Sequence, residues 1–212
     1  MIGVTIGIGS EWNSAARTAS DRMAEYTGLK CHIIDSWHGN RFEHPVWMKH
    51  KILELFPHEE SFLYFDADVW ALQPWSPSAM FIIGGGKFMI VPVPAHSAIT
   101  AECERFDIPL GRYMNAGLFM FHRGHQLVFD YTLSQHPECG RWFDQTPLNI
   151  ALVKTKTEIF ELPQKYNAEC HQGKYNANHV GVSLEEVVNL HWCSCNQAQQ
   201  VRELQNQNGG RP

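Results

Sequence analysis

The chain has 212 residues, a length that suits one domain with a single hydrophobic core. Hydrophobic residues make up 44% of it and charged residues 18%, which excludes an intrinsically disordered chain. Lys and Arg total 17 against 22 for Asp and Glu, so the net charge is −5, and this balance, with no basic block, argues against nucleic acid as a partner.

The first half of the chain alternates predicted strands with predicted helices. In order, these are a strand over 2–8, a helix over 13–26, a strand over 31–34, a helix over 45–53 and a strand over 61–65. Four apolar residues at helical spacing give the first helix its stripe: Trp12, Ala16, Ala19 and Met23. The alternation predicts an α/β fold with a parallel sheet and right-handed crossovers.

The second half of the chain is more mixed. Its predicted strands cover 87–93, 117–121, 158–162 and 187–191, and its predicted helices cover 126–133 and 146–153. We expect one domain over 1–196. A polar C-terminal tail over 197–212, helical in part, follows it, and its end is expected to be disordered.

The strongest local signal follows the third predicted strand, where Asp66 and Asp68 flank Ala67. Ligands bind beyond the carboxyl ends of strands in an open parallel sheet, and two carboxylates there are costly unless they serve a ligand. With one residue between them, both side chains can lean to one side of the chain and hold one divalent cation, Mg²⁺ or Mn²⁺. The alternative interpretation is that they cap the turn after the strand.

Three further segments carry polar groups that have both a structural and a functional interpretation. Asn115 and Gly117 form either an ordinary turn or a tight approach whose amide can bond hydroxyls. Asp144 either caps a helix or points, with Gln145, into a cleft. His191, at the end of a short apolar strand, is either a buried side chain or a nitrogen ligand of a transition metal.

Taken in this order, the pieces resemble the metal-dependent nucleotide-sugar glycosyltransferases of the GT-A fold, most closely family 8, the glycogenin and bacterial galactosyltransferase type. The resemblance covers residues 2–192. Its segments are Trp47-Met48-Lys49, Leu63-Tyr64-Phe65-Asp66-Ala67-Asp68, Asn115-Ala116-Gly117, Asp144-Gln145 with Leu148-Asn149, Leu162-Pro163 with Tyr166-Asn167, and His191. It implies a Rossmann-like GT-A domain with a mainly parallel central sheet flanked by helices.

The resemblance also implies a role for each matching residue. Asp66, Asp68 and His191 would bind Mn²⁺, or Mg²⁺, against the two phosphates of a nucleotide sugar. The donor-binding set would be Ile8, Gly9, Ser10, Lys49, Asp66, Ala67 and Asp68, with residues 8–10 against base and ribose. The catalytic set on the sugar and acceptor side would be Asn115, Asp144 and Gln145.

The implied reaction moves a sugar from a nucleoside-diphosphate sugar, with uridine as the default base, to a hydroxyl of a saccharide, lipid or protein acceptor. Family 8 enzymes retain the anomeric configuration, and because the amide of Gln145 is a poor nucleophile we expect front-face attack by the acceptor. The family usually follows its metal histidine with glycine and then Lys-Pro-Trp. Here residues 192–196 contain no lysine, so Arg202 substitutes or phosphate binding is weaker.

Three alternatives remain beside this interpretation. Asp66 and Asp68 also fit the nucleophile motif of haloacid-dehalogenase-type phosphatases, although those enzymes place it on the first strand. A nucleotidyltransferase of similar fold would carry a basic residue where Glu11 stands. A zinc-binding module could use another set of ligands, and His191 would then be lost to the Mn²⁺ site. That set is Cys170, His171, His191, Cys193 and Cys195.

The sequence also carries an expectation about the compartment. No apolar run approaches the ~18–20 residues that span a bilayer, so we expect no integral membrane segment. The start, residues 1–6, lacks the basic region and cleavage site of a signal peptide. We therefore expect a cytoplasmic protein whose six cysteines are reduced.

Overall fold

The computed structural model describes residues 1–36, 44–135, 140–171 and 174–193. The expected tail over 197–212, and with it Arg202, lies outside these residues, as does Cys195. Within the described part of the chain, none of the helices combines the length and the apolar character that crossing a bilayer requires.

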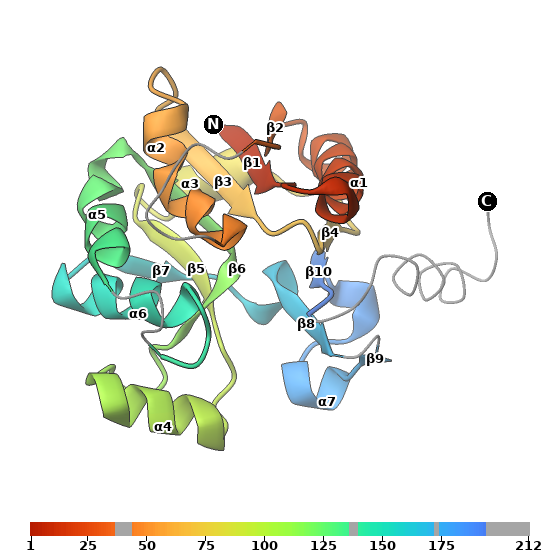
Figure 1. Cartoon of the computed structure of the whole chain (residues 1–212). Coiled ribbons are helices and arrows are strands. Elements are labelled where there is room, and N and C mark those ends of the chain that lie inside the picture. Colours follow the sequence, from red (N-terminus) through yellow and green to blue (C-terminus); the bar gives the residue numbers. More distant parts are fainter. Residues whose placement is uncertain (37–43, 136–139, 172–173, 194–212) are drawn as a thin grey trace.

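A six-stranded sheet forms the centre of the molecule, in the order β2-β1-β3-β6-β5-β7 (Figure 1). Its strands are β1 (Ile2–Ile6), β2 (Cys31–Ile34), β3 (Ser61–Phe65), β5 (Phe88–Pro92), β6 (Met114–His122) and β7 (Ile159–Glu161). Only β6 runs antiparallel to its neighbours, β3 and β5, and the other pairs are parallel. The expected mainly parallel sheet is therefore confirmed.

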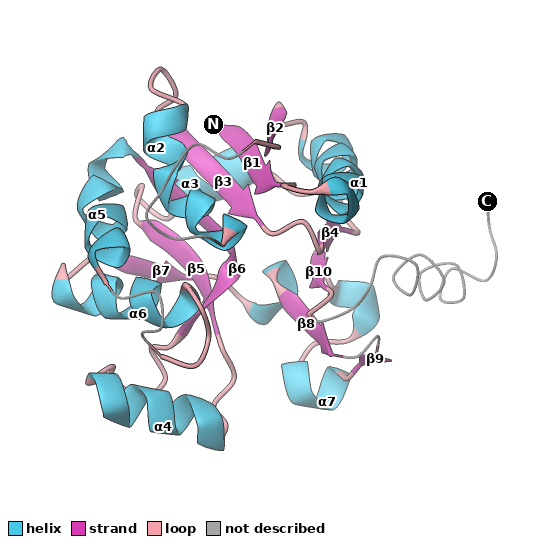
Figure 2. Cartoon of the chain, in the orientation of Figure 1, coloured by secondary structure: helices cyan, strands magenta, loops and turns pink. Residues whose placement is uncertain are grey.

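Helices cover both faces of this sheet (Figure 2). The helices of the described residues are α1 (Ser10–Thr27), η1 (Pro45–Lys51), α2 (Ile52–Leu55), α3 (Pro77–Ile83), α4 (Ser97–Phe106), η2 (Arg123–His125), α5 (Gln126–Ser134), α6 (Gln145–Lys154), η3 (Gln164–Tyr166), α7 (Ala177–Val180) and η4 (Leu184–Glu186), and α7 lies beside the second sheet described below (Figure 1). Side chains alternate along β3. Phe62 and Tyr64 pack toward η1, α2, α5 and α6, whereas Leu63 and Phe65 pack toward α1.

A second, four-stranded sheet lies beside the first, in the order β4-β10-β8-β9. Its strands are β4 (Val69–Ala71), β8 (Ala168–His171), β9 (Lys174–Tyr175) and β10 (Asn189–His191). They have two to four residues each, too few for a clear period-two pattern, and only β10 was predicted from the sequence. This sheet joins the end of β3 to the C-terminal part of the described chain, because only three residues separate the end of β3 from the start of β4.

Two sequence predictions differ from the structure in ways that matter for the site. The helix expected over 45–53 is mostly a 3₁₀ helix, η1, whose residues 47–50 are all buried, so it is an interior segment and not an amphipathic surface helix. Trp12, expected in the buried stripe of the first helix, is 52% exposed, although Ala16, Ala19 and Met23 are buried. Trp12 lies in the first turn of α1 and borders a cavity there instead of the core.

Candidate functional site

Two carboxylates and an imidazole converge where β3 ends and the second sheet begins. Asp66 follows β3, Asp68 precedes β4, and His191 ends β10, which pairs with β4. One ligand atom from each of the three residues lies within 4.8 Å of the other two. The backbone N–H of Asp66 donates to the Gly117 carbonyl at 2.8 Å, and that of Trp192 donates to the Asp68 carbonyl at 2.9 Å. These bonds attach the turn to β6 and β10.

The electrostatics of this cluster favour a bound cation. Burial raises the pKa of Asp66 and the neighbouring Asp68 raises it further, although Lys49 opposes both. Burial would also raise the pKa of Asp68, but His191 lowers it below its usual range. Burial alone would lower the pKa of His191, while Cys193 and Asp68 raise it well above the usual value. A divalent cation would supply the positive charge that the two carboxylates take from Lys49 and His191, in place of the imidazolium proton.

Lys49 is a buried lysine between two carboxylates. Its side chain is 1% exposed, and its Nζ lies 3.2 Å from Asp66 Oδ1 and 3.1 Å from Asp144 Oδ2. It also donates to the Ala116 carbonyl at 3.2 Å, which accounts for all three ammonium protons. Burial alone would lower the pKa of Lys49, but Asp144 and Asp66 raise it above its usual value, so the ammonium is charged. Lys49 therefore fixes the two carboxylates relative to each other.

Asp144 does not act as a helix cap. It occupies the N-cap position of α6, but its side chain makes no cap hydrogen bond. Its Oδ2 instead contacts Lys49 Nζ and His50 Nε2, the second at 3.0 Å. Burial would raise the pKa of Asp144, and Lys49 and His50 lower it below its usual range. The carboxylate is thus ionised and anchored from two sides.

The amides predicted for the sugar side are held by the backbone and by one another. Gln145 Oε1 accepts from the Ala116 N–H at 2.9 Å. Asn115 Oδ1 accepts from the Gly117 N–H at 2.7 Å and from Asn167 Nδ2 at 2.8 Å, while its own Nδ2 donates to Glu169 Oε1. These side chains are oriented before any ligand is present.

Gly117 meets the imidazole of His191 so closely that no side chain fits between them. A Cβ at position 117 would lie 2.3 Å from His191 Cε1 and 2.9 Å from Asn115 Oδ1. The close approach at Gly117 is thus made by His191, and it lies within β6 and not in a turn before it. The glycine is needed here because the backbone of β6 passes directly against the imidazole of His191.

Two cavities adjoin at the carboxylate pair. The smaller, of about 240 Å³, is lined by Ile6, Ile8, Trp12, His44, Pro45, Val46, Tyr64, Asp66, Ala67 and Asp68. The larger, of about 570 Å³, is bordered by Lys49, Asn115, Asp144, Gln145 and His191 among others. Trp12, Asp66 and Asp68 line both. Of the expected donor-binding residues, Gly9 and Ser10 form the start of α1 and line neither cavity.

No family model matches the sequence, and no curated protein matches it. Solved glycosyltransferases superpose on it. One that is involved in glycosylation of the major capsid of PBCV-1 has a TM-score of 0.61 at 18% identity, over 96% of this chain and 98% of that chain. The galactosyltransferase LgtC, solved with donor and acceptor sugar analogs, has a TM-score of 0.63 at 13% identity, over 99% and 96%. The chain has the GT-A fold.

Mouse xyloside xylosyltransferase 1 also superposes, with a TM-score of 0.61 at 9% identity, over 92% of this chain and 98% of that one. The GT-A fold disagrees with the phosphatase alternative, since Asp66 follows the third strand along the chain and not the first. It agrees with the strand, helix and sheet order expected from the sequence.

The zinc module that the sequence left open as an alternative is not assembled in the described residues. Cys170 is fully buried in the core, whereas His171, His191 and Cys193 line the larger cavity. Cys195 lies outside the described residues. The two proposed ligands on β8 therefore lie on opposite sides of that strand. Cys170 belongs to neither of the candidate metal clusters in the described residues.

Sequence reasoning missed Glu169, which lies opposite His191 in the pairing of β8 with β10. It contacts Asn115 and its Oε2 lies 3.1 Å from His171 Nε2. The signal was present in the polar, apolar, polar alternation of Glu169, Cys170 and His171, which is typical of a strand with one buried face. The segment is only four residues long, and no strand was predicted there.

Proposed function

We propose that this chain is a metal-dependent glycosyltransferase that moves a sugar from a nucleoside-diphosphate sugar, expected to be a UDP-sugar, to a hydroxyl of a saccharide, lipid or protein acceptor. The observation that carries the proposal is the convergence of Asp66, Asp68 and His191 at the border of two cavities. The GT-A fold supports it, because the solved proteins that share the fold with this chain are named as glycosyltransferases.

The cluster of two carboxylates and one imidazole fits a divalent cation. His191 Nδ1 is buried and has no hydrogen-bond partner among the described residues. The carboxylates of Asp66 and Asp68 are 27% and 15% exposed toward solvent, so an ion can reach them. Carboxylate oxygens with an imidazole nitrogen favour Mn²⁺ over Mg²⁺. When bound, the cation would stabilise the negative charge that develops on the diphosphate leaving group.

The smaller cavity suits the nucleoside. Its walls are mostly apolar, from Ile6, Ile8 and Val46, and Trp12 borders it with a half-exposed indole. Stacking of a base on an aromatic side chain contributes ~1–3 kcal/mol. Ala67, between the two carboxylates, lines this cavity together with Asp66 and Asp68. We therefore assign base and ribose to this cavity and the diphosphate to its border.

The larger cavity suits the sugar and the acceptor. Asn115, Asp144 and Gln145 border it, and each is held by hydrogen bonds within the protein. The carboxylate of Asp144 is bonded to Lys49 and His50, and Gln145 is an amide, so neither is suited to form a covalent glycosyl intermediate. We therefore propose front-face attack by the acceptor hydroxyl with retention of configuration, which proton NMR of the initial product would establish.

Ligand-dependent unfolding tests the donor site. The wild type is heated with Mn²⁺ alone and with Mn²⁺ plus UDP, GDP or ADP, and the same series is run on Asp68→Asn. A ligand at about 100 times its dissociation constant adds ~2.7 kcal/mol of stability. We expect stabilisation by one nucleotide that requires Mn²⁺ and is lost in Asp68→Asn.

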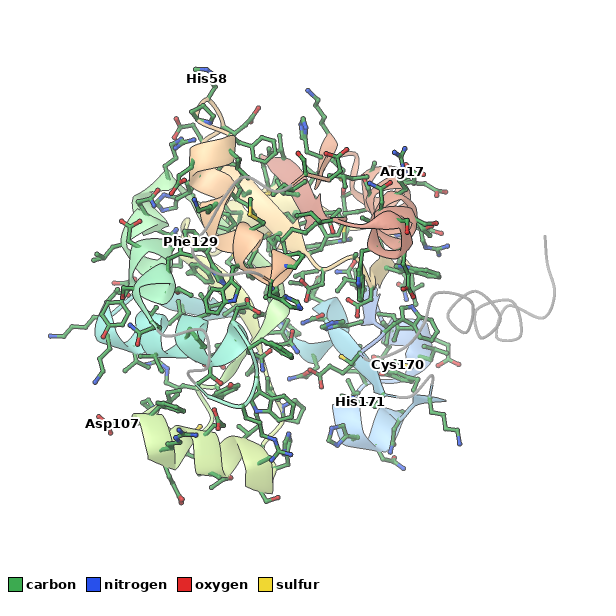
Figure 3. The ribbon with its side chains drawn as sticks, in the orientation of Figure 1. Arg17, His58, Asp107, Phe129, Cys170 and His171 are labelled. Carbon is green, nitrogen blue, oxygen red and sulfur yellow. The ribbon has the colours of Figure 1, made fainter. Side chains whose placement is uncertain are left out.

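A matched control is Asp107→Asn, because Asp107 is exposed at the end of α4, away from the site, and asparagine tolerates its left-handed backbone (Figure 3). This variant should behave as the wild type. The absence of stabilisation by any of the three nucleotides would contradict the proposed donor site.

A further inference from the structure

A second group of possible metal ligands adjoins the first. Glu169, His191 and Cys193 each offer one ligand atom, and these atoms lie within 4.8 Å of one another. The first group consists of Asp66, Asp68 and His191, and the two groups have only His191 in common. It contains a thiol, an imidazole and a carboxylate, whereas the first group contains an imidazole and two carboxylates.

Strand alternation explains why these three side chains meet. Glu169 lies opposite His191 in the parallel pairing of β8 with β10, and Cys193 follows His191 by two residues. Cys170, which follows Glu169, and Trp192, which separates His191 from Cys193, point the other way and are fully buried in the core. Cys170 and His171 are neighbours on β8 (Figure 3). The cavity-facing side of β8 and β10 is thus lined with metal-ligating residue types.

Hydrogen bonds from neighbouring side chains hold the carboxylate of Glu169 in one orientation. Asn115 Nδ2 donates to its Oε1, and His171 Nε2 lies 3.1 Å from its Oε2. Such outer contacts hold ligating carboxylates in metal sites. The imidazole of His191 is 9% exposed, and its Nδ1 has no hydrogen-bond partner in the described part of the chain. A buried unpartnered nitrogen is expensive unless it serves a ligand.

The two groups favour different ions. Thiolate and imidazole ligands with a carboxylate are typical of Zn²⁺, while oxygen-rich sets suit Mn²⁺ and Mg²⁺. A neutral imidazole has one lone pair, because its other nitrogen carries the proton. His191 can therefore coordinate only one ion at a time.

We propose that Glu169, His191 and Cys193 form a Zn²⁺ site that competes with the Asp66–Asp68 pair for His191. All five residues border the larger cavity, so an ion can enter from solvent. Zn²⁺ bound to the second group withdraws the imidazole from the first and weakens Mn²⁺ binding there. The second group is an inhibitory zinc site beside the proposed donor site.

Cobalt substitution tests the new site without any nucleotide. Metal-stripped full-length protein is titrated with Co²⁺, and the thiolate-to-cobalt charge-transfer absorption in the near ultraviolet is recorded. We expect this band in the wild type, its loss in Cys193→Ser, and its retention in Cys31→Ser, a matched control on β2 outside the cavity. Binding of Zn²⁺, measured by displacement of Co²⁺, should weaken by at least ~10-fold in Cys193→Ser and in Glu169→Gln.

Competition tests the sharing of His191. The free Mn²⁺ signal in electron paramagnetic resonance is followed with and without one equivalent of Zn²⁺. We expect Zn²⁺ to lower the affinity for Mn²⁺ at least ~10-fold in the wild type and to have a much smaller effect in Cys193→Ser. This arm alone depends on the proposed function, since it requires Mn²⁺ at Asp66 and Asp68.

Three results would overturn the proposal. They are no thiolate–cobalt band in the wild type, a band unchanged in Cys193→Ser, and equal displacement of Mn²⁺ by Zn²⁺ in wild type and Cys193→Ser. The last would place Zn²⁺ in the Asp66–Asp68 group. If the wild type shows the cobalt band but binds no Mn²⁺, the zinc site stands and the proposed function fails.

Discussion

Two carboxylate centres lie on either side of Lys49 and differ in how their charge is balanced. Asp144 is 4% exposed and contacts both Lys49 and His50, and its pKa is lowered below its usual range because these neighbours outweigh its burial. Asp66 shares the same lysine, but burial and the adjacent Asp68 raise its pKa above the usual range. The neighbours of Asp144 outweigh the cost of burying its charge, whereas those of Asp66 do not.

The difference separates a carboxylate whose charge the protein itself stabilises from one suited to bind a cation. A buried charge that is fully paired holds elements together, and here Asp144 ties α6 to η1. A carboxylate pair that borders two cavities, with the pKa of Asp66 raised by burial and by Asp68, is suited to bind a cation. Lys49 connects the two centres, so substitutions around it should show which role each carboxylate has.

The largest effect should follow removal of the shared lysine. Lys49→Met leaves Asp66 and Asp144 without their buried cation, and breaking a buried ion pair on one side costs about 3–5 kcal/mol. Urea unfolding measures the loss. Lys87→Met is the matched control, because Lys87 pairs with Glu158 at 3.1 Å on the surface and its side chain is 45% exposed. We expect that control to change stability by less than about 1 kcal/mol. An equal effect of both substitutions would contradict a central role for Lys49.

A smaller effect is expected at the contact between β6 and His191. Gly117→Ala places a Cβ against the imidazole, which should cost about 1–3 kcal/mol and lower Mn²⁺ affinity at least ~10-fold. The double variant Gly117→Ala with His191→Ala removes the steric clash. Its loss of stability should therefore be less than the sum of the two single losses. Additive losses would show that the clash is not with the imidazole.

Trp12 lines the smaller cavity next to the Asp66 centre, where we place the nucleoside. Trp12→Ala should weaken binding of UDP in the presence of Mn²⁺ about fivefold, or ~1 kcal/mol, through loss of stacking on the base. Its effect on stability should be under about 0.5 kcal/mol, because the indole is half exposed. Leu127→Ala, another exposed apolar residue that lines neither cavity, is the control in calorimetric titration. Equal UDP affinity in Trp12→Ala and wild type would place the base elsewhere.

The smallest effect has the opposite sign. Asp66→Asn should stabilise the metal-free protein by about 0.5–1 kcal/mol at pH 7, because a carboxyl whose pKa is raised on folding opposes folding when it ionises. The gain should disappear as pH falls below the unfolded pKa of about 4, where wild-type Asp66 is protonated in both states.

Asp144→Asn should show the reverse in the same urea series. A carboxyl whose pKa is lowered on folding contributes stability above its unfolded pKa and loses it as pH falls through the folded pKa. Asp144→Asn should therefore destabilise at pH 7 and approach the wild type in acid. If both substitutions destabilise at pH 7 by the same amount, the two carboxylates do not differ in the way that we infer.

Much of the central sheet could be predicted from the sequence, because its signals are local. The alternation of apolar strands and helices over the first 65 residues predicted the order of β1, α1, β2 and β3. The position of Asp66 and Asp68 after a buried strand was likewise enough to mark the candidate site. The second sheet escaped prediction, since its strands are too short to show a period.

The order of the main elements and the carboxylate pair after β3 were thus determined by sequence alone, since hydrophobic period and turn residues act over a few positions. The grouping of His191 with Asp66 and Asp68 was expected only through the family resemblance. Tertiary structure alone decided that Glu169 and Cys193 surround the same imidazole and that Lys49 turns inward. Those contacts join segments far apart along the chain. They depend on the register of β4, β10 and β8 and on the close approach of β6 at Gly117, neither of which a local pattern encodes.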